Sequence, residues 1–307
     1  MGRAWTRAAR PPPLEPPVSR TSRRALASTA ALVLALAACG GDDDVATPTT
    51  SPSPSPTTSP TAEPTAEPEP TDTMAVAVYY LMDTTNGPRL YREFAARPST
   101  GDILGDAVQT MFTRAPDDDD YTSLWPTDTE VLSARVEGEL ATIDLSAEAL
   151  EGQGGSAFEV ASLQQLVHTV TAAEPSAQQV QLLVDGQPVE TLWGAADTSA
   201  PIARGPQTEV LGSIWLLMPT EGGSIAVGEE FGGVASAFEA TVNWRWLQDG
   251  AVVAEGFSTA SEGAPGRGEW SSPVEVPPGD YELEAFESSA EDGSELALDS
   301  KNVSVTE

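Results

Sequence analysis

The chain has 307 residues and a formal net charge of −32 at pH 7, from 47 acidic and 15 basic residues. Such a surface repels nucleic acid and anionic lipid headgroups, so we expect no nucleic-acid partner and, unless divalent cations bridge, no direct docking on bare anionic wall polymers. The single cysteine and single histidine exclude a disulfide framework, a His/Cys zinc site and a Cys-His catalytic pair.

The amino terminus resembles a bacterial lipoprotein signal peptide. Residues 1–38 combine an arginine-rich start with an apolar run that is too short to span a bilayer. The run ends in Leu36, Ala37 and Ala38, directly before Cys39, which is the only cysteine of the chain. A lipoprotein signal peptidase recognises small residues at these positions and cuts before a cysteine whose thiol carries diacylglycerol.

We therefore expect export, cleavage before Cys39 and anchoring of the mature chain to the outside of the cytoplasmic membrane. Each buried CH₂ of an acyl chain contributes about 0.8 kcal/mol, so two or more chains give stable anchoring. The adjacent Arg23 and Arg24 leave twin-arginine export open beside ordinary Sec export. The alternative for Cys39 is a buried, unmodified thiol, but no core-like sequence follows it before Met74.

The mature chain would be still more acidic than the whole sequence. Residues 1–38 hold six arginines and one glutamate, so their removal leaves 9 basic and 46 acidic residues and a net charge of −37. We interpret this charge as a solubility feature, with an acidic binding face as the alternative. The lipid anchor, and not headgroup charge, would then hold the protein at the membrane.

Residues 39–73 are predicted to form a linker. Thr, Ser, Pro, Ala and Glu make up nearly all of 47–73. Such a segment cannot bury enough apolar surface to offset the entropy of ordering the chain. Its frequent prolines favour a partly polyproline-II stalk, which rises about 3.1 Å per residue and lifts the folded part off the membrane.

Residues 74–207 are predicted to form an α+β domain, in which a sheet carries helices on one face. The evidence is an interleaving of alternating β-rich runs with apolar residues at helical spacing. Three turns would join strands into hairpins, at Thr84–Pro88, Glu137-Gly138 and Asp185-Gly186.

Two helices are expected in this first domain. One would start with a pair of capping-box type at Ser99 and Asp102, and the other with an S-x-x-E box at Ser156 and Glu159. The second helix would bury one apolar stripe, and His168 beside that stripe would lie in solvent.

Residues 208–307 show no convincing helix and are predicted to form an all-β, immunoglobulin-like sandwich without a disulfide. Tyr281 follows Pro278-Gly279-Asp280, a place where a tyrosine can bond back to the backbone at a strand corner. The alternating runs predict six strands, at 213–218, 241–247, 252–258, 274–276, 281–286 and 296–305.

Both predicted domains resemble known families. The first resembles the GerMN domain of sporulation and spore germination, in the pieces 75–82, 132–145, 165–170 and 180–187. The second resembles the immunoglobulin-like domain of bacterial spore germination type that often follows GerMN in envelope lipoproteins, in the pieces 217–219, 233–239 and 278–283. The resemblance implies a non-enzymatic, extracytoplasmic interaction protein of the cell envelope, without implying a germination role.

The densest charge run is Asp117, Asp118, Asp119 and Asp120, which are the candidate metal ligands of this sequence. Ca²⁺ prefers hard oxygen ligands, but adjacent residues point apart, and the spaced ligands and glycine of a calcium loop are missing. We therefore expect a solvated loop and no bound metal.

Other motifs give no catalytic constellation and predict no cofactor. His168 lacks an evident partner for general-base catalysis, and Gly152–Gly155 lacks the lysine of a phosphate loop. Acidic residues are so abundant that a carboxylate pair for glycoside hydrolysis stays open without being located. Trp244, Trp246 and Trp270 are expected to pack in the core, with an aromatic binding surface as the alternative.

The leading functional hypothesis is a membrane-anchored scaffold or adaptor that acts without catalysis. It would bind an envelope protein through a sheet edge or the groove between its domains. A peptidoglycan- or glycan-binding module is the second hypothesis, and an envelope hydrolase using a carboxylate pair is the third.

Overall fold

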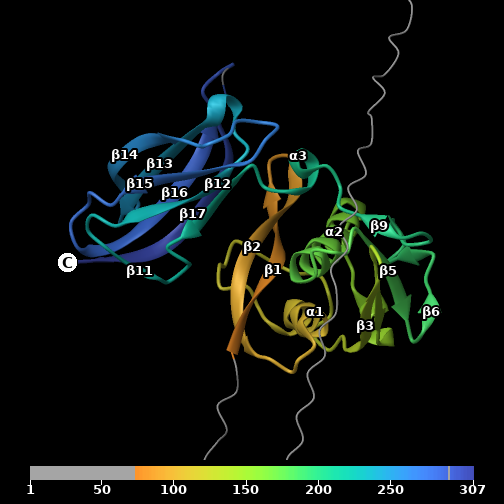
Figure 1. Ribbon diagram of the computed structural model, residues 1–307. Helices are drawn as coiled ribbons and strands as arrows, with labels where there is room; N and C mark the ends of the chain where they lie inside the picture. Colours follow the sequence, from red (N-terminus) through yellow and green to blue (C-terminus); the bar gives the residue numbers. More distant parts are fainter. Residues whose placement is uncertain (1–72, 290) are drawn as a thin grey trace, which may run out of the picture. The chain divides into compact units, whose positions relative to one another are not determined.

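The computed structural model describes residues 73–289 and 291–307 (Figure 1). The predicted signal peptide, its cysteine and nearly all of the predicted linker lie outside these residues. Two hydrophobic clusters organise the described chain, one drawn from residues 76–215 and the other from 214–305. No helix in this part of the chain is long and apolar enough to cross a membrane.

The first two strands form a hairpin. β1 (Thr73–Thr84) and β2 (Gly87–Pro98) pair antiparallel along their whole length, so the predicted hairpin is confirmed, with longer strands than expected. Gly87 has a φ of +85°, a left-handed conformation that glycine adopts without a steric penalty. The strands are long because apolar side chains, including Tyr80 and Tyr91, are buried at their centre.

The first helix, α1 (Ile103–Thr113), starts where the sequence predicts but with a different cap. Asp102 is the N-cap, and its carboxylate accepts a 2.8 Å hydrogen bond from the backbone N–H of Gly105. Ser99 instead accepts from the N–H of Gly101 in the preceding turn. The predicted pairing of Ser99 with Asp102 is therefore wrong, since one aspartate caps the helix alone.

The second long helix, α2 (Ser156–Ala173), has no side-chain cap. The chain reaches it through Gly155 in an extended conformation, and Gly155 is the N-cap. Ser156 is therefore the first helical residue, one position too late to accept from the N–H of Glu159 as a capping box requires. The capping-box prediction is wrong, although the predicted buried stripe forms, with Leu166, Val167 and Val170 inaccessible.

A second sheet lies on the other side of the helices. Its strand order is β3-β4-β5-β6, with β4 and β5 parallel and joined through α2. The hairpins at Gly138 and Asp185 are confirmed, and both residues have positive φ. The strands are β3 (Val131–Glu137), β4 (Leu140–Leu145), β5 (Gln179–Val184) and β6 (Gln187–Pro188). The smaller elements are η1 (Ala147–Glu151), β7 (Thr191–Leu192), β8 (Ala196–Asp197) and β9 (Ile202–Ala203), which pairs with β5.

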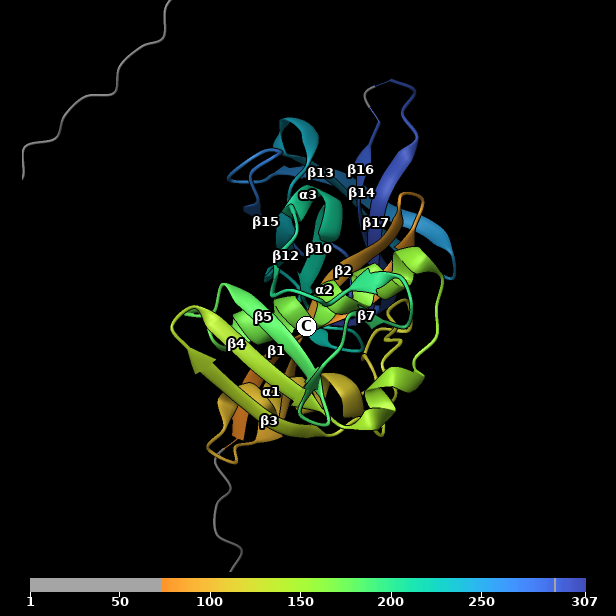
Figure 2. The same ribbon diagram turned by 90° about the vertical axis from the view of Figure 1, so that its right-hand side faces the viewer.

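These elements form three layers. The helices α1 and α2 lie between the β1–β2 hairpin and the β3–β6 sheet, as Figures 1 and 2 show from two sides. The predicted α+β class, a sheet with helices on one face, is confirmed. The hairpin covers the opposite side of the helices, so residues on both sides of α2 are removed from solvent.

The carboxyl-terminal part is a sandwich of two sheets, which confirms the predicted all-β class. The five-stranded sheet has the order β11-β17-β16-β13-β14, and the three-stranded sheet the order β10-β12-β15. The strands are β10 (Ile214–Met218), β11 (Ser224–Ala226), β12 (Glu230–Ala235), β13 (Thr241–Gln248), β14 (Ala251–Thr259), β15 (Gly268–Pro273), β16 (Gly279–Ser288) and β17 (Glu295–Thr306). Two short helices, α3 (Gln207–Val210) and η2 (Phe238–Ala240), were not expected.

The sandwich departs from the predicted strands mainly in its smaller sheet. No strand forms at 274–276, whereas β11, β12 and β15 were not anticipated. The central strand β12 contains Gly232 and Gly233, where an added Cβ would lie 2.2 Å from the carbonyl of Trp270 and 1.9 Å from that of Trp215. Glycines that permit this close approach hide the strand, because they remove the alternation that predicts one.

The tyrosine corner is confirmed. The hydroxyl of Tyr281 donates a 2.9 Å hydrogen bond to the backbone carbonyl of Pro277, four residues earlier. This bond closes the turn into β16 at the position where an immunoglobulin-like sandwich commonly carries it.

Candidate interaction site at the junction of the two cores

The two hydrophobic clusters meet on β10. Ile214 and Leu216 pack in the sandwich core, whereas the side chain of Trp215 between them belongs to the first cluster. The indole Nε1 of Trp215 donates a 3.0 Å hydrogen bond to the carbonyl of Leu90 on β2, and its ring meets Tyr79 edge-on at 6.0 Å. A single strand thus serves both cores because successive side chains point to opposite faces.

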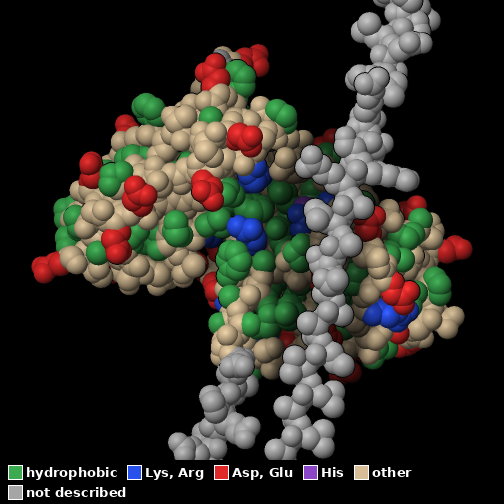
Figure 3. Space-filling model, in the orientation of Figure 1, with side chains coloured by type: hydrophobic (Ala, Val, Ile, Leu, Met, Phe, Trp, Pro, Cys, Tyr) green, Lys and Arg blue, Asp and Glu red, His purple; other side chains and the backbone are tan. Residues whose placement is uncertain are grey.

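Two guanidinium groups flank this tryptophan. Arg267 lies 4.6 Å from the ring centroid of Trp215 and Arg92 lies 5.4 Å from it, within cation–π range. Burial lowers the pKa of Arg267 to about 10. Arg92 also stacks over Phe94 at 4.9 Å. Figure 3 shows Lys and Arg side chains among apolar ones near β2, whereas Asp and Glu are scattered over the sandwich.

A buried ionic cluster joins the loop after α1 to β17. Lys301, the only lysine of the chain, is 5% exposed and forms ion pairs with Asp118 and, at 3.8 Å, with Asp299. It also donates a 2.9 Å hydrogen bond to the hydroxyl of Tyr121. Tyr121 in turn donates to Asp299 at 2.8 Å, and the backbone N–H of Leu216 donates to the other oxygen of Asp299 at 2.6 Å.

The electrostatics of this cluster follow from burial. Burial raises the pKa of Asp299 to about 6, against the opposing effects of the Lys301 ammonium and the hydrogen bonds from Leu216 and Tyr121. Burial alone would lower the pKa of Lys301, but the carboxylates of Asp299 and Asp118 reverse this and raise it. The ammonium therefore stays charged and holds two carboxylates away from water.

The structure places the predicted aspartate run partly inside this cluster. Asp118 is 3% exposed, so the prediction of a solvated loop is wrong for this residue. Asp117 pairs with Arg114, and Asp120 accepts a 2.9 Å hydrogen bond from the hydroxyl of Ser300. Across residues 73–289 and 291–307, no three His, Cys, Asp or Glu side chains are grouped so as to hold a metal ion.

Sequence reasoning missed Lys301 and Asp299. On β17 they continue the inward face of Val303 and Val305, and all four side chains are buried. The alternation of a half-buried strand would have located them, since two charged residues at inward positions require partners.

His168 is buried, which contradicts the prediction that it lies in solvent. It is 2% exposed, and its ring packs 5.2 Å from that of Tyr79. Burial, with a smaller effect from Arg204, lowers its pKa to about 3. Neither ring nitrogen has a hydrogen-bond partner among the described residues. The error arose because α2 is covered on two sides and has almost no solvated face.

The tryptophans of the sandwich pack in its core, as expected. Trp246 and Trp270 are buried and Trp244 is half-buried. All three stand edge-on to Phe231, with ring centroids 5.1 to 6.2 Å apart. They do not form the aromatic binding surface that was the alternative prediction.

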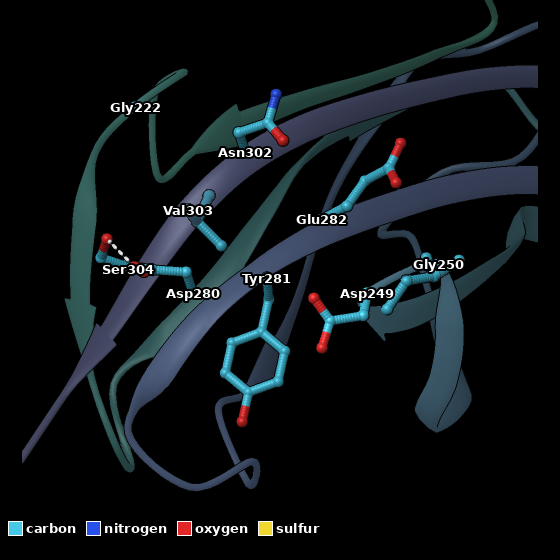
Figure 4. A pocket seen from close by; sticks show the side chains of 10 residues that line it. Gly222, Asp249, Gly250, Asp280, Tyr281, Glu282, Asn302, Val303 and Ser304 are labelled. Carbon is cyan, nitrogen blue, oxygen red and sulfur yellow. Dashed lines mark hydrogen bonds between the residues drawn. The ribbon is translucent and has the colours of Figure 1, made fainter.

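An acidic hollow lies at one end of the five-stranded sheet, with a volume of about 390 Å³ (Figure 4). Asp249, Asp280 and Glu282 line it, but their carboxylates point in different directions. Asp280 already accepts a 2.7 Å hydrogen bond from the hydroxyl of Ser304. These groups do not converge on one point as a catalytic carboxylate pair must.

The predicted lipid-attachment site lies outside the described residues. Leu36, Ala37, Ala38 and Cys39 therefore stay predictions from the sequence, and so do the domain boundaries at 74–207 and 208–307.

Comparison with known proteins agrees with both resemblances. The family of sporulation and spore germination domains (Germane) matches residues 77–190, and the immunoglobulin-like domain of bacterial spore germination matches 213–294. No curated protein matches the chain.

Three solved structures are similar to part of the chain. A protein described as "Putative Lipoprotein from Clostridium perfringens" is 25% identical, with a TM-score of 0.31 over 43% of this chain and 87% of that one. The tandem GerMN domains of the sporulation protein GerM from Bacillus subtilis are 16% identical, with a TM-score of 0.37 over 47% and 50%. The first GerMN domain of that protein is 18% identical, with a TM-score of 0.36 over 43% and 98%.

Proposed function

We propose that this chain is a lipid-anchored, non-enzymatic scaffold of the cell envelope. Its matches to a sporulation and spore germination domain over residues 77–190 and to an immunoglobulin-like domain of bacterial spore germination over 213–294 support a role in the envelope. The lipoprotein motif ending at Cys39 supports the anchor. The composition of residues 39–73 supports a stalk that carries the folded part away from the membrane.

The observation that carries this proposal is the shared core at Trp215. Domains in one chain move relative to each other unless their interface is large and apolar. Here separation would expose the indole of Trp215 and part the buried Asp118 from Lys301, its counter-ion on β17. Two modules fixed in this way hold their surfaces at a constant spacing, which is what a scaffold needs to position a partner.

The anchor is tested by the variant Cys39→Ser in the full chain. We expect the wild-type protein in the membrane fraction and the variant in the soluble or secreted fraction, because the variant has no thiol to acylate. Ser53→Ala in the predicted linker is the matched control and should stay with the membrane. Retention of Cys39→Ser in the membrane fraction contradicts the anchor.

The scaffold role is tested by crosslinking the full-length protein in cells. We expect one dominant protein adduct, and a spread of random adducts would count against the proposal. Co-sedimentation with purified sacculi in the absence of other proteins would favour a peptidoglycan-binding module instead. A clearing zone in cell-wall zymography would favour a hydrolase.

A further inference from the structure

The outer edge of β2 is the strongest candidate for the partner-binding surface. In the β1–β2 ladder Leu81 pairs with Leu90, Tyr79 with Arg92, and Ala77 with Phe94. The first two pairs direct their backbone groups away from the partner strand. Leu81 exchanges two hydrogen bonds with Thr122, at 2.8 and 2.7 Å, and the carbonyl of Leu90 accepts from the backbone N–H of Gly212 at 3.0 Å.

The same alternation applies further along β2. Since ladder pairs alternate between inward and outward backbone groups, Arg92, Phe94 and Ala96 belong to the outward set. On the β1 side the outward N–H of Tyr79 is satisfied by the hydroxyl of Thr169 on α2. On the outer side of β2, away from β1, no described residue makes a backbone hydrogen bond to the strand beyond Leu90. An edge of about three outward residues is therefore left open.

A small pocket of about 40 Å³ adjoins this edge. Phe94 on β2 and Leu216 and Leu217 on β10 form its apolar wall, and the rest of its lining is polar or charged, including Arg92. Phe94 is 55% exposed, although it is a large aromatic side chain on a strand. An open strand edge beside exposed apolar side chains is the usual arrangement for adding a further strand.

The charges around the pocket select the kind of segment it fits. Its acidic side chains are engaged: Glu93 accepts from two backbone N–H groups, Asp117 pairs with Arg114, and Glu221 accepts from Asn302. The guanidinium of Arg92 makes no hydrogen bond or ion pair with any described residue. This guanidinium is therefore the charged group available to a ligand, and a carboxylate is its natural partner.

We propose that the edge of β2 at residues 92–96 binds an extended segment of an envelope protein as a third strand, with an apolar side chain against Phe94 and Leu217 and a carboxylate on Arg92. This inference rests on the proposed scaffold function and names its binding surface. A second copy of the chain fits less well, because each mature copy carries a net charge of −37 by sequence and would be repelled.

The experiment places the photo-crosslinking residue p-benzoylphenylalanine at Phe94 of the full-length protein in cells. The matched control position is Phe257, which is 69% exposed on the edge strand β14. We expect one discrete protein adduct from position 94 and none from 257. Mass spectrometry of the adduct should locate the crosslink in an extended segment with Asp or Glu within two residues of an apolar one.

Two further variants test the chemistry of the site. Arg92→Glu should reduce the adduct about tenfold, because a charge-assisted hydrogen bond becomes a repulsion. Arg135→Glu, on the exposed part of β3, should leave it unchanged. In a chain with the crosslinker at Leu217, Phe94→Pro should abolish the adduct, because it removes an outward N–H but no ladder bond. The melting temperature of each variant shows that it is folded.

The outcomes separate the site from the function. A discrete partner adduct from 257 but not from 94, or no effect of Arg92→Glu, overturns the edge site and leaves the scaffold function standing. An adduct between two copies of the chain, or with its own residues 39–72, also overturns the edge site. The absence of any discrete adduct from 94, 217 and 257 counts against both proposals.

Discussion

The hydroxyl of Tyr121 donates a 2.8 Å hydrogen bond to the carboxylate of Asp299, which lies 178 residues further along the chain. Tyr121 belongs to the loop after α1 and to the first hydrophobic cluster, and Asp299 to the last strand of the sandwich, so the bond joins the two parts of the described structure. Lys301 contacts both groups and also pairs with Asp118. The cluster is satisfied as a whole, and removal of one member leaves a buried charge without its partner.

Lys301→Met is therefore expected to destabilise the protein strongly. The substitution leaves Asp118 and Asp299 buried without their counter-ion, and breaking a buried ion pair from one side typically costs about 3–5 kcal/mol. Urea denaturation of the full chain, followed by tryptophan fluorescence, measures the loss. Arg135→Met is the control, since its pair with Glu137 is exposed and should contribute under about 1 kcal/mol. Equal effects of the two variants would contradict a buried ionic cluster.

Asp299→Asn is expected to change how stability depends on pH. Folding raises the pKa of Asp299 from 3.8 to about 6, so the folded state favours the protonated carboxyl. The destabilisation from ionising it is absent below about pH 4, grows as the pH rises from about 4 to 6, and is complete above about pH 6, at about 3 kcal/mol. Relative to the variant, the wild type should thus lose unfolding free energy as the pH rises from about 4 to 6. Parallel curves of unfolding free energy for the two proteins would show that Asp299 is solvated.

The parts of the fold that the sequence predicts are those specified locally. The turns at Gly138 and Asp185 depend on residues that tolerate positive φ, and the corner at Tyr281 depends on a bond across four residues. The class of each domain follows from spacing that repeats over many residues. These features are set by residues close in the sequence and do not depend on which distant segments pack against an element.

The errors share the opposite property, since each depends on a distant segment. Asp118 is buried because β17 supplies Lys301 from 183 residues away, and His168 because the hairpin covers α2. Gly232 lies in a central strand only because two neighbouring strands approach its backbone. The open edge of β2 likewise depends on the register of the hairpin and on the position of β10, neither of which the sequence states.

Tyr281→Phe is expected to cost about 1 kcal/mol of unfolding free energy. The substitution removes only the hydroxyl that donates to the carbonyl of Pro277, and an intramolecular hydrogen bond contributes about that amount. Tyr79→Phe is the matched control, because the hydroxyl of this buried ring makes no hydrogen bond within the described residues. A loss of stability in the control as large as in Tyr281→Phe would mean that the corner bond contributes nothing.

His168→Phe is expected to protect the protein against acid. Burial lowers the pKa of His168 from 6.5 to about 3, so the folded state favours the neutral ring. The unfolding free energy has its full value above pH 6.5, where the ring is neutral in both states. It falls by up to about 5 kcal/mol as the pH drops towards 3. The sign is opposite to that of Asp299, and the two effects oppose each other between pH 4 and 6.

The comparison of His168→Phe with the wild type isolates this effect. The difference in unfolding free energy between the two proteins should shift in favour of the variant by about 1.4 kcal/mol per pH unit below pH 6. His168→Leu, which has a smaller side chain and also does not titrate, should show the same slope with a different offset. If both variants follow the wild-type pH curve, the imidazole of His168 gains its proton at the same pH in the folded and unfolded protein. That result would contradict a buried ring without a hydrogen-bond partner.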